Sequence, residues 1–106
     1  MEVAMDSYKI IITSKAQSDL SSCIAFVLNV SKEAAFNLAN DIYASIQSLT
    51  NFPEKNPIFE MPKTFPYTIR KQIVNKRYVL LYAIENSSIV IYRILDSRRE
   101  FDYLLA

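Results

Sequence analysis

The sequence contains no glycine and no histidine, and its one cysteine is Cys23. Average usage of about 7% would give roughly seven glycines in a chain of this length. Without glycine there is no Gly-rich loop of the kind that cradles phosphates. Without histidine, Ser-His-Asp and Cys-His catalytic arrangements and nearly all structural zinc sites are excluded. A lone cysteine forms no internal disulfide, so nothing points to an oxidising compartment. We expect no bound metal or cofactor.

Long apolar runs are also missing. The longest, Tyr78–Ile84, is much shorter than the roughly 18 residues of a membrane span. The N-terminus, MEVAMDSYK, lacks the basic region of a signal peptide. We therefore expect a cytoplasmic protein with no membrane partner, folded as one domain over residues 1–106. Residues 1–6 are expected to form a flexible extension, with Met5 as an alternative start.

Charge is unevenly spread, although the formal net charge is only +1. Residues 1–55 carry four basic and six acidic side chains, a balance of −2. Residues 56–106 carry eight and five, a balance of +3. The second half therefore has either a solvated sheet face or a local surface for an anionic partner. The whole-chain charge is too low for a nonspecific nucleic-acid binder.

Two helices are predicted in the first half of the chain. Ser14 and Gln17 match a capping box, which predicts a helix from Lys15 to about Asn29. Ser31 can cap a second helix that runs to about Thr50. The link is so short that the two must form an antiparallel hairpin. Apolar residues recur at helical spacing: Ala16, Leu20, Cys23, Ile24 and Val27, then Ala35, Leu38, Ala39, Ile42, Ile46 and Leu49.

Three side chains of these helices allow more than one interpretation. Cys23 lies in the first apolar stripe and is expected to be a buried packing residue, because no histidine is present to activate it. Phe36 and Tyr43 form a second apolar line on the second helix. They either flank the core or offer a patch to a partner.

The rest of the chain is predicted to be mostly strands and turns. All four prolines lie between Pro53 and Pro66, which predicts an ordered loop and excludes a helix or a central strand there. Turns are expected at Asn75-Lys76 and over residues 86–88. The segment Arg77–Glu85 is apolar on both faces, as a central strand would be. The predicted strands are Tyr8–Ile12, Tyr67–Val74, Arg77–Glu85 and Ile89–Leu95.

A second capping box, Ser97 to Glu100, predicts a short terminal helix that ends near Leu105. The order is then βααβββα, an α+β fold. We expect the helical hairpin to pack on one face of a mostly antiparallel four-stranded sheet. The other face would be only partly covered, with the terminal helix as the candidate cover.

Basic residues gather on the last strands, and two of them are unusual. Arg98 and Arg99 fall in the first turn of the expected helix, where a cation is disfavoured by about 0.3–1 kcal/mol. They either pair with Asp96, Glu100 or Asp102, or present guanidinium groups to a carboxylate or phosphate. The basic residues of this region are Arg70, Lys71, Lys76, Arg77, Arg93, Arg98 and Arg99.

Metal-independent RNA cleavage is the enzymatic alternative. It needs a base for the 2′-hydroxyl, cations for the developing charge and an acid for the leaving oxygen. Arginine cannot release its proton at neutral pH, so lysine, tyrosine or glutamate would have to act. Tyr78 and Tyr82 share a strand face with Leu80 and Ile84, which is typical of a core. The enzymatic signal is therefore weak. The available residues are Lys76, Tyr78, Tyr82, Tyr92 and Tyr103.

Four segments together carry a family resemblance. They are YKIIITSKAQSDLSSCIAFV at residues 8–27, LTNFP at 49–53, RYVLLYAI at 77–84 and IVIYRILDSRREFDYLL at 89–105. In order, spacing and total length they resemble the RelE/ParE superfamily of bacterial toxins from type II toxin–antitoxin systems. The resemblance implies the α+β fold above, no cofactor, a cognate antitoxin partner and a role of the plasmid-stabilization type.

The superfamily has two main activities. RelE-like members cleave mRNA in the ribosomal A site, and ParE-like members poison DNA gyrase. The segment YRILDSRREF is more similar to the ParE-like branch, although Asp96 and Ser97 stand where that branch often has histidine and glycine. The cleaving branch commonly has arginine or lysine in its third strand, where this chain has Val79 and Leu81. This difference counts against a nuclease.

The leading hypothesis is a growth-inhibiting toxin that acts on DNA gyrase and is held inactive by a small antitoxin. The alternatives are a ribosome-dependent mRNA endoribonuclease and a non-toxic module that only pairs with an antitoxin. Two oligomeric states are compatible with this hypothesis, a homodimer and a toxin–antitoxin hetero-oligomer. The candidate target contacts are Arg98, Arg99, Arg93, Arg70 and Arg77, with Lys76 and Tyr103 as weaker candidates.

Overall fold

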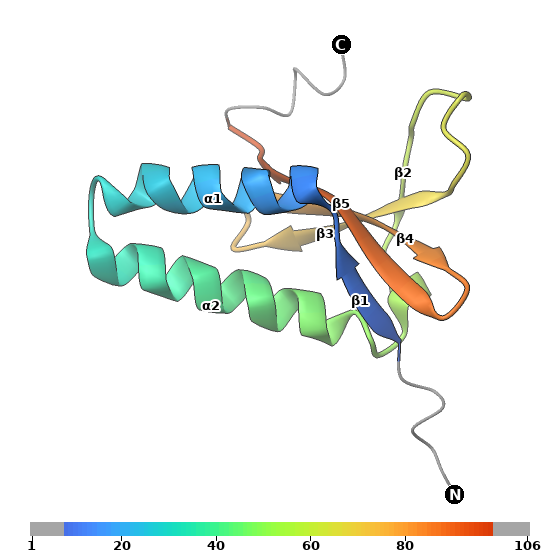
Figure 1. The fold of residues 1–106 in the computed structure, drawn as a ribbon, viewed down its shortest axis with the longest axis horizontal. Coiled ribbons are helices and arrows are strands. Elements are labelled where there is room, and N and C mark those ends of the chain that lie inside the picture. The colour runs from blue at the N-terminus through green and yellow to red at the C-terminus, as the bar shows by residue number, and fades with distance from the viewer. Residues whose placement is uncertain (1–7, 99–106) are drawn as a thin grey trace, which may run out of the picture.

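The computed structural model describes residues 8–98, which form an α+β fold with two helices and a five-stranded mixed sheet (Figure 1). The predicted extension over residues 1–6 lies outside the described residues, as does the predicted terminal helix from Arg99 onward. The helices are α1 (Ser14–Leu28) and α2 (Lys32–Ser48), and a short 3-10 helix spans Pro53–Lys55. The strands are β1 (Lys9–Ile12), β2 (Ile58–Phe59), β3 (Ile69–Val74), β4 (Tyr78–Glu85) and β5 (Ser88–Asp96).

The sheet has the strand order β1-β5-β4-β3-β2. The sheet is mostly antiparallel, as predicted, but it has five strands where four were predicted. β1 pairs parallel with β5, with Ile10 opposite Ile89, and the two-residue β2 adds an antiparallel edge strand beside β3. An edge strand can lie among prolines because its outer N–H groups need no ladder partner. The prediction that Arg77–Glu85 is a central strand is confirmed, since β4 lies in the middle of the sheet.

Helix α1 begins at Ser14, one residue earlier than predicted, and its cap is Thr13. The side chain of Thr13, not of Ser14, accepts a hydrogen bond from the Ala16 N–H at 3.0 Å. The predicted cap of α2 is confirmed, because the Ser31 hydroxyl accepts from the Ala34 N–H at 3.0 Å. Both caps satisfy a backbone donor that the first helical turn leaves unpaired.

The two helices lie together over one face of the sheet (Figure 1), and the main core lies between them and the strands. Cys23 is buried in this core, as predicted. Tyr78 and Tyr82 lie in it with Leu80, which confirms their assignment to the core. Buried residues of this core include Ala16, Leu20, Leu38, Ile42, Ile46, Leu49, Ile89, Ile91 and Ile94.

A smaller apolar cluster covers the opposite face of the sheet. Its partly buried members Met61 and Phe65 come from the proline-rich segment, so this segment covers part of that face. The cover expected from the terminal helix lies outside the described residues. The cluster consists of Phe59, Ile69, Val79, Leu81, Ala83 and Leu95, with Met61, Phe65 and Tyr92 packed against it.

The outer surface of the helical hairpin keeps apolar side chains in contact with solvent. Phe36 is 67% exposed and Tyr43 is 51% exposed, so neither flanks the core. Of their two interpretations, the surface patch is the one that fits. No helix in the described range is both long and apolar enough to cross a membrane.

Candidate functional site

A β-bulge in strand β5 shapes a candidate site among the described residues. Leu81 of β4 pairs with Arg93, whereas the next residue, Tyr82, pairs with Ile91. Tyr92 is therefore an extra residue with no partner across the ladder. Bulges redirect side chains and are frequent next to functional sites. Here the bulge places two consecutive side chains, Tyr92 and Arg93, around the same pocket.

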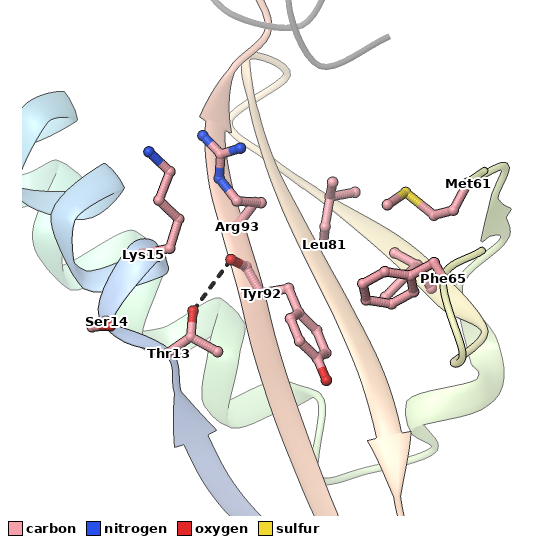
Figure 2. A pocket seen from close by; sticks show the side chains of 9 residues that line it. Thr13, Ser14, Lys15, Met61, Phe65, Leu81, Tyr92 and Arg93 are labelled. Atoms are coloured by element: carbon pink, nitrogen blue, oxygen red, sulfur yellow. Dashed lines mark hydrogen bonds between the residues drawn. The ribbon is translucent and has the colours of Figure 1, made fainter. Parts of the chain in front are cut away.

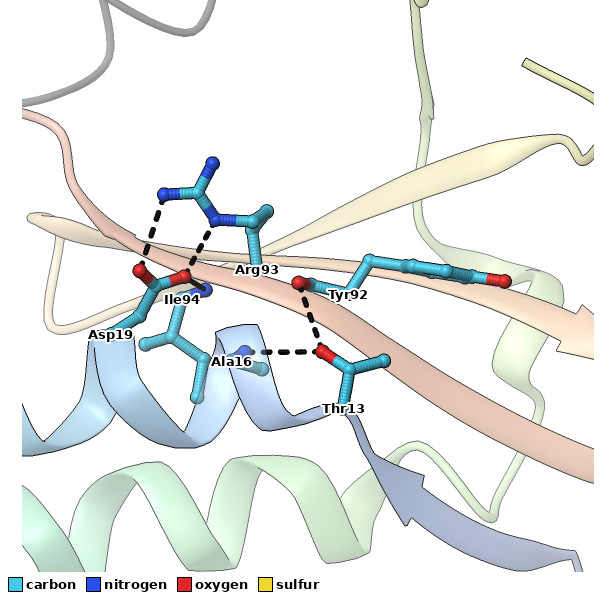
Figure 3. A network of polar contacts seen from close by, with 6 residues as sticks. All are labelled: Thr13, Ala16, Asp19, Tyr92, Arg93 and Ile94. Carbon is cyan, nitrogen blue, oxygen red and sulfur yellow. Dashed lines mark hydrogen bonds and ion pairs between the residues drawn. The ribbon is translucent and has the colours of Figure 1, made fainter.

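Helix α1 satisfies the backbone groups near the bulge (Figure 3). The Thr13 hydroxyl donates to the Tyr92 carbonyl at 3.3 Å while it also caps α1. The Ile94 N–H donates to the Asp19 carboxylate at 3.0 Å. Because buried backbone groups need partners, these two side chains fix the first turns of α1 against β5.

Arg93 forms a two-point ion pair with Asp19. The distances are 2.7 Å from Nε to Oδ2 and 3.1 Å from Nη2 to Oδ1, and Asp19 is only 7% exposed. Two parallel N–H···O bonds of this kind give both strength and directional specificity. The sequence predicted Arg93 as a target contact, and the structure gives it this internal partner.

Arg77 forms a second two-point ion pair, with the buried Asp96. Nε lies 3.0 Å from Oδ1 and Nη2 lies 2.7 Å from Oδ2. The hydrogen bond to Asp96 raises the pKa of Arg77, and burial partly opposes this. The guanidinium carbon also lies 5.3 Å from the ring centroid of Tyr78. The Arg98 N–H donates to Asp96 at 3.0 Å, so the turn after β5 is held by the same carboxylate.

The remaining predicted contact residues fall into three groups. Arg70 Nη1 donates to the carbonyls of Glu54 and Asn56 at 3.1 and 2.7 Å, so it holds the proline-rich segment. Lys76 and Arg98 are exposed. Arg99 and Tyr103 lie outside the described residues. For all the predicted contact residues, a role in target binding stays a prediction.

A polar network that the sequence did not predict anchors the proline-rich segment to α2. The Asn56 amide donates to Gln72 at 2.6 Å and to the Tyr82 hydroxyl at 3.1 Å. Gln72 in turn donates to the Ser45 hydroxyl at 2.6 Å. The Tyr82 hydroxyl donates to the Pro53 carbonyl at 2.5 Å. These contacts join groups far apart in sequence, so no local sequence pattern predicts them.

Two tyrosines near the sheet are poorly suited to proton transfer. Burial raises the pKa of Tyr92 to about 12, assisted by the hydrogen bond that its hydroxyl donates to Glu85. Burial also raises the pKa of Tyr82. A general acid or base works best with a pKa near the operating pH.

Within residues 8–98, no three histidine, cysteine, aspartate or glutamate side chains lie close enough together to hold a metal ion.

A pocket of about 370 Å³ lies beside the bulge, between the start of α1 and the proline-rich segment (Figure 2). Figure 2 shows Lys15 and Arg93 on one side and Met61 and Phe65 on the other, with Leu81 between them. Phe65 packs edge-on against Tyr92, with ring centroids 5.4 Å apart. The lining residues are Thr13, Ser14, Lys15, Met61, Phe65, Ile69, Leu81, Tyr92 and Arg93.

Comparisons with known proteins agree with this architecture. A solved chain from the chromosomal ParDE toxin–antitoxin system of P. aeruginosa superposes with a TM-score of 0.67 at 19% identity. The match covers 86% of this chain and 97% of that chain, and it shows a shared fold. No curated protein sequence matches the chain significantly. The family model for the ParE toxin of the type II toxin–antitoxin system parDE matches residues 10–101. This match spans most of the sequence, and the chain therefore belongs to the ParE toxin family, within the RelE/ParE superfamily that its sequence resembles.

Proposed function

We propose that this ParE-family chain arrests growth by binding DNA gyrase and that its cognate antitoxin neutralises it. The observation that carries the proposal is the apolar character of the sheet face opposite the helices. Val79 and Leu81, which stand where the cleaving branch commonly has basic residues, are 2% and 1% exposed. These two positions therefore supply no charge to a scissile phosphate, which favours action by protein binding over RNA cleavage.

The state of the polar groups on this face supports the same choice. Arg93 is paired with Asp19, and Tyr92 donates to Glu85. RNA cleavage would need an acid and a base that exchange protons at neutral pH, and the raised pKa of Tyr92 disfavours it in either role. Inhibition by binding needs no proton transfer, so it is compatible with this chemistry.

The turn after β5 is the proposed contact with the target. The Ser97 N–H donates to the Arg77 carbonyl at 2.9 Å, and the Arg98 N–H donates to Asp96 at 3.0 Å. Both bonds hold the turn on the end of the sheet while the Arg98 side chain stays exposed. A fixed backbone lowers the ordering cost when a guanidinium group binds a carboxylate or phosphate. Arg99 follows directly in the sequence and is proposed to act with it.

The experiment is a pair of assays on the purified protein. Gyrase supercoiling assays should show inhibition or trapped cleaved DNA, and translating ribosomes should leave mRNA intact. Ribosome-dependent mRNA cleavage without an effect on gyrase would establish the endoribonuclease alternative. Normal growth at a high level of soluble protein would establish the non-toxic module. Restoration of growth by the product of the adjacent gene tests the antitoxin partner separately.

A further inference from the structure

The sheet face opposite the helices is covered unevenly in the row of residues where β5 ends. In this row Ile73 of β3 pairs with Val79 of β4, and Val79 pairs with Leu95 of β5. Ile73 is 53% exposed, whereas Val79 and Leu95 are 2% and 0% exposed. The row is therefore open at β3 and closed towards β5, the strand that leads directly into residues 97–106.

The turn after β5 allows the chain to fold back over this row. Residues 97–98 form the turn, and the Asp96 carboxylate accepts a hydrogen bond from the Arg98 N–H, two residues on, at 3.0 Å. A carboxylate that binds the backbone in this way favours a turn. The Ser97 N–H donates to the Arg77 carbonyl at 2.9 Å, which fixes the turn beside the start of β4. The segment after Arg98 therefore starts at the closed end of the row.

The pocket beside the bulge continues the same apolar surface. Its lining residue Leu81 is two positions from Val79 on β4, and both belong to the outer apolar cluster together with Leu95. Figure 2 shows Leu81 between Arg93 and Met61. One apolar segment can therefore cover the end of β5 and fill the pocket as well.

Residues 99–106 have the sequence of such a segment. The capping box at residues 97–100 predicts a helix here. The large aliphatic and phenylalanine side chains of the segment recur at positions i, i+3 and i+4, which is one face of a helix. These residues are Phe101, Leu104 and Leu105. The predicted helix is therefore apolar on one side.

The polar residues of the segment occupy the rest of the helix surface. At 3.6 residues per turn, Arg99 and Tyr103 fall on the side opposite the apolar face. Glu100 and Asp102 flank that face. Lys15 lies at the pocket, and no acidic side chain is among the described residues that line it. The charges of the segment and of the pocket are thus complementary.

The length of the segment also fits. From Ser97 to Leu104 a helix rises about 10 Å, at 1.5 Å per residue. From Ser97 back to Arg93, which lines the pocket, the strand covers about 13 Å, at 3.3 Å per residue. A helix that runs back along β5 therefore brings Phe101 close to the row where β5 ends, and it brings residues 104–105 to the pocket.

We propose that residues 99–106 dock on the outer sheet face of their own chain, with Phe101 against Leu95 and the two leucines in the pocket. The covalent link favours this occupant over a separate molecule, because a short linker gives an effective concentration in the millimolar range. The docked helix turns Arg99 and Tyr103 away from the sheet, towards solvent. The use of these two side chains against a target rests on the proposed function, but the docking itself does not.

Thermal melting of the purified protein tests which side of the segment is docked. Phe101→Ser and Leu104→Ser should each lower the melting temperature by about 4–8 °C, as loss of a modest apolar contact does in a domain of this size. Tyr103→Ser is the matched control from the opposite side of the helix, and it should melt within about 2 °C of the wild type. Equal shifts in all three variants, or no shift in any, would overturn the proposal.

A disulfide tests where the leucines lie. Met61→Cys combined with Leu104→Cys or with Leu105→Cys should form an internal disulfide on mild oxidation in at least one pair, because the Cα atoms must approach within about 7 Å. Met61→Cys with Tyr103→Cys is the control and should stay mostly reduced. Cys23 is buried and does not compete. Equal yields in all pairs, or none in the leucine pairs, would overturn docking in the pocket.

Dilution separates docking within one chain from docking between two copies. Over a dilution on the order of a hundredfold, the melting temperature and the yield of internal disulfide should stay constant, because only association between molecules depends on concentration. Disulfide-linked dimers, or a melting temperature that falls on dilution, would assign the segment to a second copy and overturn the proposal. These measurements use the protein without gyrase or antitoxin. A chain that fails to inhibit gyrase can therefore still confirm the docking, and a gyrase inhibitor can still refute it.

Discussion

The Asp19 carboxylate lies 2.7 Å from Arg93 Nε and 3.0 Å from the Ile94 nitrogen, so it binds a side chain and the backbone of β5 together. The two residues that it contacts are neighbours in a strand that bulges at Tyr92. One buried acid on α1 thus fixes both the position of the helix and the local path of the strand. The pocket between α1 and the proline-rich segment depends on this junction.

Replacing Asp19 by alanine should destabilise the protein. The variant loses the acceptor of three hydrogen bonds, two from Arg93 and one from Ile94. Hydrogen bonds to charged groups contribute about 1.5–3 kcal/mol, so we expect the free energy of unfolding to fall by about 2–3 kcal/mol. Urea denaturation measures it. Ser18→Ala, at an exposed position on the same helix, should stay within about 0.5 kcal/mol of the wild type. Equal stability of both variants would show that Asp19 is dispensable.

Alkaline pH should weaken the fold through Tyr92. Its pKa is raised to about 12 in the folded protein, against about 10 in the unfolded chain. Between these two values the unfolded state binds fewer protons, so stability falls as pH rises. The contribution is fully present below about pH 10 and is lost towards about pH 12.

The variant Tyr92→Phe removes this pH dependence. Urea midpoints measured at several pH values should therefore fall less steeply above about pH 10 in the variant than in the wild type. Tyr43→Phe changes an exposed tyrosine on α2 and should keep the wild-type slope. Parallel slopes for wild type and Tyr92→Phe would contradict the assignment.

The absence of glycine leaves strain in the turn between β3 and β4. Asn75 and Lys76 have φ of 54° and 59°, a conformation that non-glycine residues other than asparagine and aspartate rarely adopt. For a non-glycine residue the left-handed conformation costs about 1–2 kcal/mol. Glycine avoids this cost, but it loses more backbone entropy on folding, which lowers stability by about 0.5–1 kcal/mol. Lys76→Gly should therefore raise the free energy of unfolding by about 0.5–1 kcal/mol.

The matched control for that variant is Lys71→Gly in β3, where φ is negative. It removes the same side chain but relieves no strain, so it should lower stability. Thermal melting of the two variants gives the comparison. If Lys76→Gly melts as early as Lys71→Gly, the turn stores no strain that glycine can release.

Local signals account for the parts of the fold that the sequence predicted. Ser31 caps α2, Asn75-Lys76 forms the turn, and the strand that is apolar on both faces lies in the middle of the sheet. The parallel pairing of β1 with β5 is a long-range contact, as is the edge pairing of β2. Nothing in the sequence near Ile58 distinguishes a two-residue strand from an ordered loop, because its partner is Arg70.

The site was less predictable for the same reason. Composition identified the arginines but not their partners, since Arg93 pairs with Asp19 at a separation of 74 residues. One local signal for the bulge does exist. Ile89, Ile91 and Ile94 all face the helices, and the step of three in place of two marks an extra residue in the strand.

The last prediction concerns Arg98 and Arg99. Arg98 is exposed on a turn that backbone hydrogen bonds to Asp96 and Arg77 hold in place. Truncation of exposed side chains should change the free energy of unfolding by no more than about 0.5 kcal/mol. Loss of a hydrogen-bonded charge contact with a partner would cost about 2–5 kcal/mol of binding. The double variant Arg98→Ala with Arg99→Ala should therefore fold and bind the antitoxin but fail to arrest growth.

Thermal melting beside a growth assay tests the double variant, and Arg77→Ala provides the contrast. Because Arg77 is clamped to the buried Asp96, its loss should lower the melting temperature, a result that the double variant should not share. A much earlier melt of the double variant would show that Arg98 and Arg99 are structural. Normal melting with full toxicity would place the active surface elsewhere. Arg70 and Arg77 would then be the next candidates, and because both make internal contacts, their effects on target binding would have to be separated from their effects on folding.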